Sequence, residues 1–136
     1  MFNFKDVYIN DYVTLIGPQE SSFLNNANEV MEDYYFGEST IEKAEIKMQN
    51  TVLDKLIKLN HPNLIIGGEL SNQLAFTNMS LRNRNIPFLG IYSACASSAE
   101  GFIILGNMIS AKQIKNAIFI TSSHNLTAEK QFRFPV

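Results

Sequence analysis

The chain has 136 residues, of which 46% are hydrophobic and 18% are charged, a balance typical of one soluble globular domain. Its net charge is −2 and its basic residues form no stripe, which argues against nucleic acid as a partner, because phosphate contacts need a clustered cationic surface. A single cysteine, Cys95, and two histidines exclude an internal disulfide and a closed zinc site, and the apolar runs are too short to cross a membrane. We therefore expect an intracellular protein with no metal or cofactor and peripheral membrane contact at most.

Two short β-branched segments open the chain, at 7–9 and 13–16, and each predicts a strand. Gly17-Pro18 ends the second segment, since this dipeptide favours a turn. Residues 19–38 are polar and rich in Asn, Glu and Ser, so they predict a long loop with at most one irregular helix.

A long amphipathic helix is predicted after this loop. Ser39 and Glu42 form a capping-box pattern, in which the hydroxyl accepts from a helical N–H and the carboxylate reaches back. Apolar residues then recur every three or four positions, which places them on one helix face: Ile41, Ala44, Met48, Val52, Leu56 and Leu59. Pro62 cannot continue the hydrogen-bond ladder, so the helix should end at Asn60-His61.

The remainder of the chain alternates apolar and amphipathic segments. The expected elements are, in order, a strand at 63–70 with a glycine turn at its end, a helix at 71–84, a strand at 87–94, a helix at 97–112 and a strand at 117–121. The helix at 97–112 is apolar nearly all round, which predicts burial on most sides. This alternation implies one α/β domain over residues 1–136 with a mostly parallel sheet.

The residue best placed for chemistry is Cys95, in the turn between the strand at 87–94 and the apolar helix. Free N–H groups and the positive dipole end of the helix favour a thiolate there, which suits a nucleophile for acyl transfer. The alternative is a small buried hydrophobe. Nucleophilic catalysis would also require a base and an oxyanion hole.

Glu69 and His124 are expected at the same rim of the sheet, because ligands gather at the carboxyl ends of parallel strands. His124 follows the last predicted strand, and the alternative for it is a solvated loop histidine. Glu69 ends the strand at 63–70, and the alternative is a carboxylate at the N-terminus of the next helix. His61 should be exposed beside Pro62 and is a poor candidate for a base.

Three segments carry a family likeness. IPFLGIYSACASSAEG, residues 86–101, resembles the nucleophile-cysteine turn of the thiolase superfamily. Taken with FITSSHNLTAEKQFRFP, residues 119–135, it resembles the stage V sporulation protein AD family, whose pattern is SSH-ATAE-QFR-P. GGEL-NQ, residues 67–73, is similar to the GDL-GQ element of that family, with Glu69 where the family usually has Asp.

The resemblance implies the N-terminal half of a thiolase-like fold, with a buried central helix after the Cys95 turn and a pocket for pyridine-2,6-dicarboxylate (dipicolinate). Cys95 holds the place of the thiolase nucleophile, Glu69 that of an acidic pocket residue, and His124 matches the histidine of SSH, so these three are the expected ligand-binding residues. The resemblance also implies that the chain works with other SpoVA proteins in moving calcium dipicolinate into the developing spore, peripherally at the inner spore membrane.

Members of this family continue past QFRFP into an edge strand and a second half, which in thiolases supplies the basic catalytic residues and covers the buried helices. Since this chain stops at Val136, we expect a truncated member that is not an enzyme and forms a homodimer to cover its apolar face. An alternative is a thiolase-type acyltransferase, similar to ketoacyl synthases, that uses Cys95 with a second chain. A third alternative is a remnant that folds but binds nothing.

Overall fold

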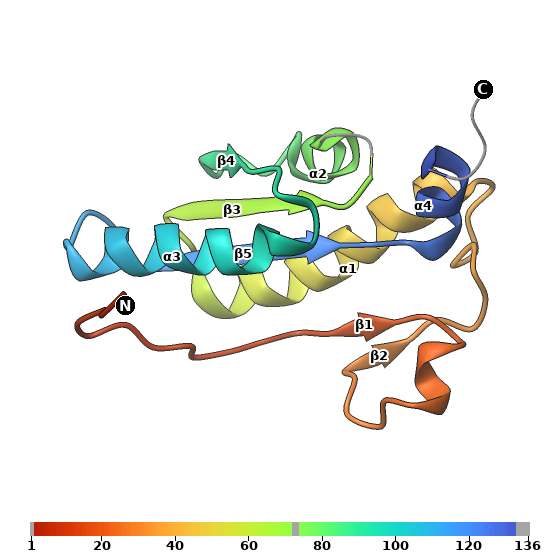
Figure 1. Ribbon diagram of the computed structural model, residues 1–136, viewed down its shortest axis with the longest axis horizontal. Helices are drawn as coiled ribbons and strands as arrows, with labels where there is room; N and C mark the ends of the chain where they lie inside the picture. The colour runs from red at the N-terminus through yellow and green to blue at the C-terminus, as the bar shows by residue number, and fades with distance from the viewer. Residues whose placement is uncertain (1, 72–73, 133–136) are drawn as a thin grey trace.

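A computed structural model describes residues 2–71 and 74–132, in which three parallel strands form a sheet flanked by helices (Figure 1). In chain order, the main elements are α1 (Ile41–Asn60), β3 (Leu64–Glu69), α2 (Ala75–Leu81), β4 (Phe88–Gly90), α3 (Ser97–Ser110), β5 (Ala117–Ser122) and α4 (Asn125–Phe132). The parallel pairing confirms the predicted α/β class.

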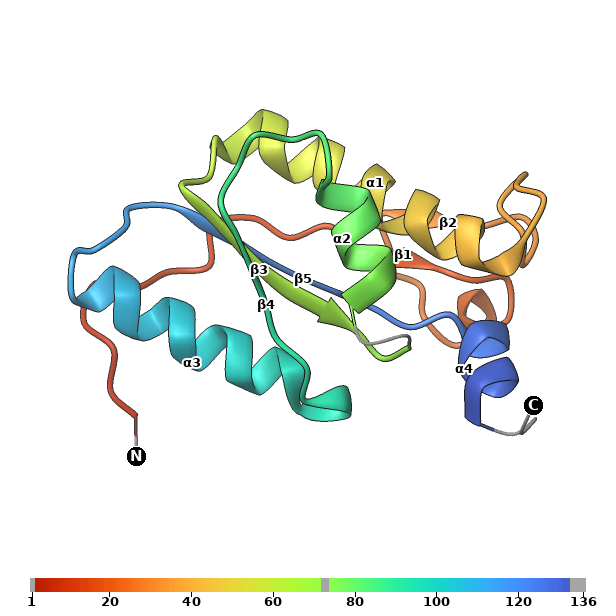
Figure 2. The same ribbon diagram turned by 90° about the horizontal axis from the view of Figure 1, so that it is seen from above.

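The sheet has the order β4-β3-β5, so β3 is the central strand. Successive side chains of a strand point to opposite faces: Ile65 packs against α1 and α2, whereas Ile66 packs on the side of α3. Figure 2 shows α1 and α2 on one face of the sheet and α3 on the other. Coverage of both faces explains why the strand sequences are apolar with little alternation.

Helix α1 ends where predicted, but its start and its buried face differ from the prediction. Thr40, not Ser39, is the N-cap and accepts from the Lys43 N–H at 3.2 Å, so the helix begins one residue later than the capping-box pattern indicated. Its innermost stripe includes the polar residues Glu45 and Gln49. Leu59, predicted to face the core, is 64% exposed.

The glycines of β3 do not form the predicted turn. Gly67 and Gly68 lie within the strand and are buried. A Cβ on Gly67 would lie 2.3 Å from the Ile120 carbonyl oxygen, and one on Gly68 would lie 2.1 Å from the Ile91 carbonyl oxygen. These positions are therefore glycine because neighbouring backbone approaches too closely for any side chain.

The all-round apolar sequence of helix α3 predicted burial on most sides, but the helix is not buried in this way. Leu105 faces the sheet and is 6% exposed, whereas Phe102 is 48% exposed and stacks in a tilted arrangement on Phe119 of β5. Gly106 on another side of the helix lies against Phe4 of the N-terminal segment, so α3 has partners on two sides and its open side carries the Phe102 ring.

The N-terminal part of the chain contains less regular structure than predicted. Residues 7–9 form no strand, and the second predicted strand is reduced to β1 (Leu15–Ile16). The predicted polar loop contains a short 3-10 helix at Glu20–Ser22 and a strand, β2 (Glu29–Val30), that pairs in parallel with β1. In Figure 1 the N-terminal segment runs beneath the sheet and α1 before it reaches β1.

The accessible surface is large for the mass of the chain. It amounts to 8763 Å² for 15.4 kDa. A folded monomer of this mass exposes about 7,200 Å² by the usual scaling, so roughly 1,600 Å² is in excess. The excess agrees with the many exposed apolar side chains of the N-terminal segment, α3 and β4.

Candidate functional site

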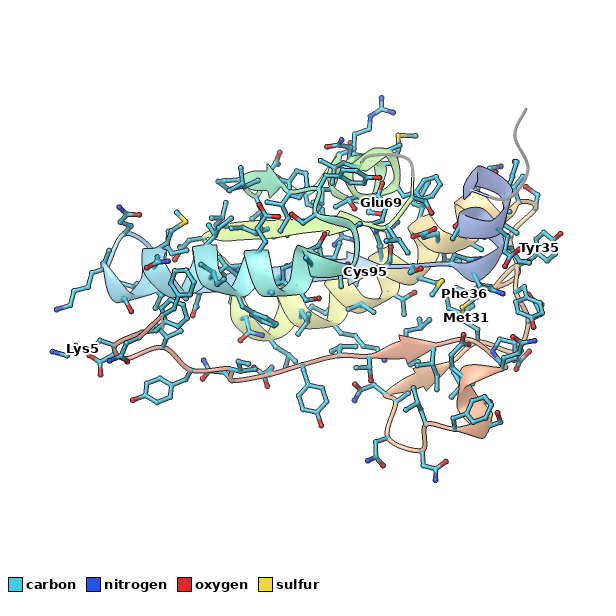
Figure 3. All side chains as sticks on the ribbon, in the orientation of Figure 1. Lys5, Met31, Tyr35, Phe36, Glu69 and Cys95 are labelled. Atoms are coloured by element: carbon cyan, nitrogen blue, oxygen red, sulfur yellow. The ribbon has the colours of Figure 1, made fainter. Side chains whose placement is uncertain are left out.

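The three residues predicted to bind a ligand lie at the carboxyl ends of the three strands, as expected for a parallel sheet. Glu69 ends β3, Cys95 follows β4 and His124 follows β5. Figure 3 shows Glu69 beside α2 and Cys95 where α3 begins. The side chains nevertheless have different surroundings, and only one of them is open to solvent.

Cys95 is exposed, so it is not the small buried hydrophobe that was the alternative interpretation. It lies in a 3-10 turn (Ala94–Ala96) that leads directly into α3. Ala94 has a φ of 48°, in the left-handed region that a residue with a Cβ rarely adopts. The turn is held by the buried Ser97, whose hydroxyl donates to the Ala94 carbonyl at 2.9 Å.

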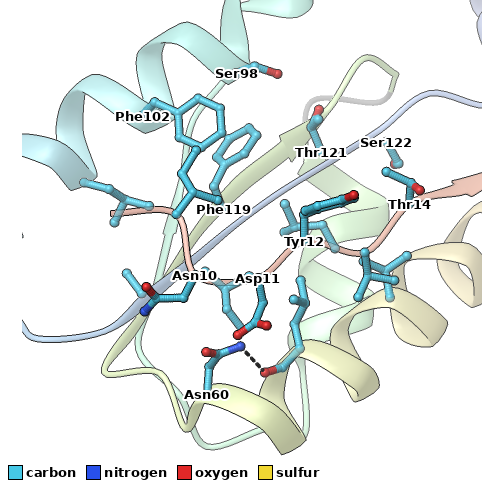
Figure 4. A pocket seen from close by; sticks show the side chains of 18 of the residues that line it. Asn10, Asp11, Tyr12, Thr14, Asn60, Ser98, Phe102, Phe119, Thr121 and Ser122 are labelled. Carbon is cyan, nitrogen blue, oxygen red and sulfur yellow. Dashed lines mark hydrogen bonds between the residues drawn. The ribbon is translucent and has the colours of Figure 1, made fainter. Parts of the chain in front are cut away.

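A groove of about 800 Å³ connects the Cys95 turn to the far end of β5. One wall is the N-terminal segment 6–16, and the other walls are α1, β5 and α3 (Figure 4). At the Cys95 end the lining is polar, with hydroxyls from Ser98, Thr121 and Ser123. The sequence alone did not place these hydroxyls beside Cys95.

Glu69 is 1% exposed and its carboxylate is fully engaged with α2. It accepts hydrogen bonds from the Phe76 N–H at 2.9 Å and the Thr77 N–H at 3.1 Å, and the Thr77 hydroxyl donates to it as well. This is the arrangement of a carboxylate at a helix N-terminus, where free N–H groups and the helix dipole stabilise negative charge.

His124 is 4% exposed, so the interpretation as a solvated loop histidine is wrong. Its Nδ1 accepts from the Leu126 N–H at 3.2 Å, which leaves the proton on Nε2 to donate to the Tyr34 carbonyl at 2.6 Å. The ring therefore fastens the start of α4 to the loop before α1. His61, at the other end of α1, is exposed as predicted.

A buried polar network beneath the rim was not predicted from the sequence. Gln49, 2% exposed, donates from Nε2 to the Thr77 hydroxyl at 3.1 Å and to the Ser122 hydroxyl at 2.8 Å. Each hydroxyl in turn donates a hydrogen bond to a carboxylate, Thr77 to Glu69 and Ser122 to Glu45. The amide thus connects two buried acidic groups from α1 and β3.

Glu45 is fully buried, and burial raises the pKa of its carboxyl group, with the neighbouring Glu69 carboxylate acting in the same direction. Hydrogen bonds from Ser122 and Thr127, each 2.7 Å, lower the pKa and so offset part of that increase. A coulombic interaction with His124 also lowers the pKa, but it is the smallest of these effects. The charged form of Glu45 is therefore held in the protein at a cost in stability.

Replacing Glu45 by Gln should raise the stability at neutral pH and weaken its pH dependence. A folded-state pKa above the unfolded one means that native protein binds the proton more tightly, so stability falls as pH rises through the interval between the two values. The Thr127 hydroxyl can accept a hydrogen bond from the new amide, because it can donate its own hydrogen bond to the His124 carbonyl at 2.8 Å. Urea unfolding from pH 4 to 8 checks this, with the exposed Glu32→Gln as control. A less stable Glu45→Gln protein at pH 7 would contradict it.

The described residues offer Cys95 no catalytic base. Both ring nitrogens of His124 are engaged, and His61 lies at the far end of α1. Among residues 2–71 and 74–132, no group of three or more His, Cys, Asp or Glu side chains is placed to hold a metal ion. What this arrangement provides chemically is a polar groove end with a helix N-terminus, a thiol and several hydroxyls.

Comparison with a family model and with a curated protein identifies the same family for this chain. The family described as "Stage V sporulation protein AD (SpoVAD)" matches residues 2–136. The Stage V sporulation protein AD of Bacillus subtilis (strain 168) is 28% identical over 136 residues, which cover 95% of this chain and 40% of that protein. The chain therefore spans less than half the length of this relative.

Proposed function

Because the chain belongs to the stage V sporulation protein AD family, we propose that it acts in sporulation as a dipicolinate-binding component of the SpoVA transport system. The observation that carries this proposal is the family match over residues 2–136. The thiolase-like architecture expected from the Cys95 turn is part of the same proposal, and the strand-turn-helix geometry around Cys95 supports it.

The proposed ligand site is the Cys95 end of the groove. Carboxylates of dipicolinate would accept hydrogen bonds from N–H groups at the start of α3 and from the hydroxyls of Ser98 and Thr121. The polar atoms of Glu69 and His124 form hydrogen bonds within the protein, so the proposed role of these two residues is to position α2 and α4 around this rim.

Charge favours the calcium complex over the free dianion. Among the described residues that line the groove, the only Lys or Arg side chain is Lys115, which precedes β5 and so lies at the end opposite Cys95. A bare dianion would have no cation beside it at the proposed site, whereas Ca²⁺ bound to two carboxylates neutralises them. We therefore propose calcium dipicolinate as the preferred form of the ligand.

Equilibrium dialysis with dipicolinate, with and without calcium, tests the site. We expect retention of calcium dipicolinate by the wild-type chain and at least tenfold weaker binding by Cys95→Phe, which fills the groove end. Ala111→Phe places the same ring at an exposed position at the other end of α3 and should bind normally. Benzene-1,3-dicarboxylate, which lacks the ring nitrogen, should bind more weakly. Equal binding by Cys95→Phe would refute the site, and no retention would refute the function.

We propose that the chain is not an enzyme, since Cys95 lacks a base within the described residues. Intact-mass analysis after incubation with acyl-CoA should therefore show no acylated Cys95 that turns over. Continuous thiol-dependent release of CoA would support the alternative, an acyltransferase that gains its base from a second chain.

We also propose that the chain forms a homodimer, associates with other SpoVA proteins and stays peripheral to the membrane. Among the described residues, no helix combines the length and apolar character needed to span a bilayer. Within the part of the chain that the structure describes, the outer edge of β4 has no partner strand, and Leu89 and Tyr92 beside it are 42% and 45% exposed. An apolar open edge favours two-fold pairing. Light scattering after size exclusion should give twice the mass of one chain; a soluble monomer at high concentration would exclude this dimer.

A further inference from the structure

The first third of the chain has a strongly one-sided charge. Residues 6–42 contain no Lys or Arg, yet they carry eight of the thirteen Asp and Glu residues. Three of these carboxylates pair with lysines of α1 and α4: Glu29, Glu38 and Glu42. The other five form no ion pair with a described residue: Asp6, Asp11, Glu20, Glu32 and Asp33. This part of the surface therefore carries negative charge that the chain does not neutralise.

Two adjacent apolar side chains lie in solvent within this acidic part, directly after the 3-10 helix that joins β1 to β2 (Figure 1). Phe23 is 83% exposed, the highest value among the large hydrophobic side chains of the described residues, and Leu24 is 54% exposed. The Glu20 carbonyl accepts hydrogen bonds from the Phe23 N–H at 3.0 Å and the Leu24 N–H at 2.9 Å. The two apolar side chains are thus held within one turn of the Glu20 carboxylate.

A hollow of about 130 Å³ opens between this turn and the start of α4. Its walls are largely apolar and include Leu15, Pro18, Met31 and Met48. Among the described residues of its lining, Glu20 is the one carboxylate, and there is no Lys or Arg. Pockets for small-molecule ligands measure about 300 Å³ or more, so this hollow has room for a single side chain. A long side chain with an apolar stem and a positive end matches apolar walls that carry one carboxylate.

We propose that this hollow, together with Phe23 and Leu24, is a docking surface for a basic segment of a partner protein. One Lys or Arg of that segment enters the hollow and pairs with Glu20, and apolar residues beside it cover Phe23 and Leu24. The unpaired carboxylates of residues 6–42 attract a cationic segment and repel nucleic acid and anionic lipid at this surface. The inference does not depend on dipicolinate binding, so each of the two can fail without the other.

A random twelve-residue peptide library displayed on phage tests the chemistry of the partner. The wild-type chain is the bait, and peptides that also bind the double variant Glu20→Gln, Phe23→Ser are removed. We expect the remaining peptides to share a Lys or Arg next to apolar residues. Fluorescence anisotropy with a synthetic copy of the best peptide should then show at least tenfold weaker binding when norleucine replaces that Lys or Arg.

Matched variants separate this surface from general attraction between opposite charges. Glu20→Gln and Phe23→Ser should each weaken binding of the peptide at least fivefold, with circular dichroism showing that both variants are folded. Asp54→Asn removes a carboxylate 57% exposed on α1, and Met79→Ser removes an apolar side chain 56% exposed on α2; both should bind the peptide as the wild type does.

Three results would overturn the proposal. The first is a set of peptides without a shared Lys or Arg, or no peptide that distinguishes the wild-type chain from the double variant. The second is a loss of binding in Asp54→Asn equal to the loss in Glu20→Gln, since the attraction would then be unspecific. The third is protection of residues 17–24 from hydrogen exchange in a dimer without peptide, because a second copy of the chain would then be the occupant.

Discussion

Gly68→Ala should leave the chain largely unfolded. The added Cβ would lie 2.1 Å from the Ile91 carbonyl oxygen and 2.8 Å from a methyl group of Leu74. The backbone after β4 cannot withdraw freely, because the Ile91 N–H donates to the Gly67 carbonyl at 3.0 Å. We expect a loss above about 4 kcal/mol, which is comparable with the whole stability of a small domain. Circular dichroism and urea unfolding measure the effect.

Gly17→Ala is the matched control for this substitution. Its Cβ would meet only the side chain of Glu20, at 2.6 Å from Oε2, and a surface carboxylate can rotate away. The expected change is under about 1 kcal/mol. If Gly68→Ala were as stable as Gly17→Ala, the strands would tolerate a wider separation than the structure shows.

Gln49→Ala should cost about 3 kcal/mol in the free energy of unfolding. Both hydroxyl partners donate their hydrogen bonds to carboxylates, so the amide must direct its NH₂ group to them as donor. Alanine removes both of these hydrogen bonds from the amide. Each contributes about 1 kcal/mol net, and the vacated volume adds a cavity cost. The Gln49 carbonyl oxygen has no partner among the described residues, so its removal costs little.

Two further variants separate these effects. Gln49→Leu fills most of the volume but makes no hydrogen bond, so it should lose less stability than Gln49→Ala. Gln113→Ala removes an exposed amide and should change stability by less than about 0.5 kcal/mol. Equal stability of Gln49→Ala and Gln113→Ala in urea would show that the network contributes nothing to folding.

Local sequence patterns predicted the parts of the fold that depend on local physics. The spacing of apolar residues and Pro62 predicted where α1 ends, and the apolar runs predicted all three strands of the main sheet. Cys95 was placed correctly in the turn before α3, because a strand end followed by an apolar helix is a pattern within a few residues.

The polar interior could not be predicted in this way, because its partners are distant in sequence. The predicted apolar face of α1 did not include Gln49 or Glu45, yet these residues are buried and bond to residues 28 to 82 positions away. His124 looked solvated because its neighbours are polar, but its Nε2 is paired with a carbonyl 90 positions earlier. Burial of a polar side chain becomes visible only once its partner is known.

The all-parallel sheet also affects how the chain reaches its native state. Neighbouring strands of the sheet are separated in sequence by at least one helix. Leu64 of β3 therefore pairs with Ala117 of β5 only after α2 and α3 have been synthesised. Non-local pairing of this kind slows folding, because the entropy of closing the loop is lost before any contact compensates for it. The outer edges of β4 and β5 have no partner strand among the described residues, so they are the first place at which newly made chains would aggregate.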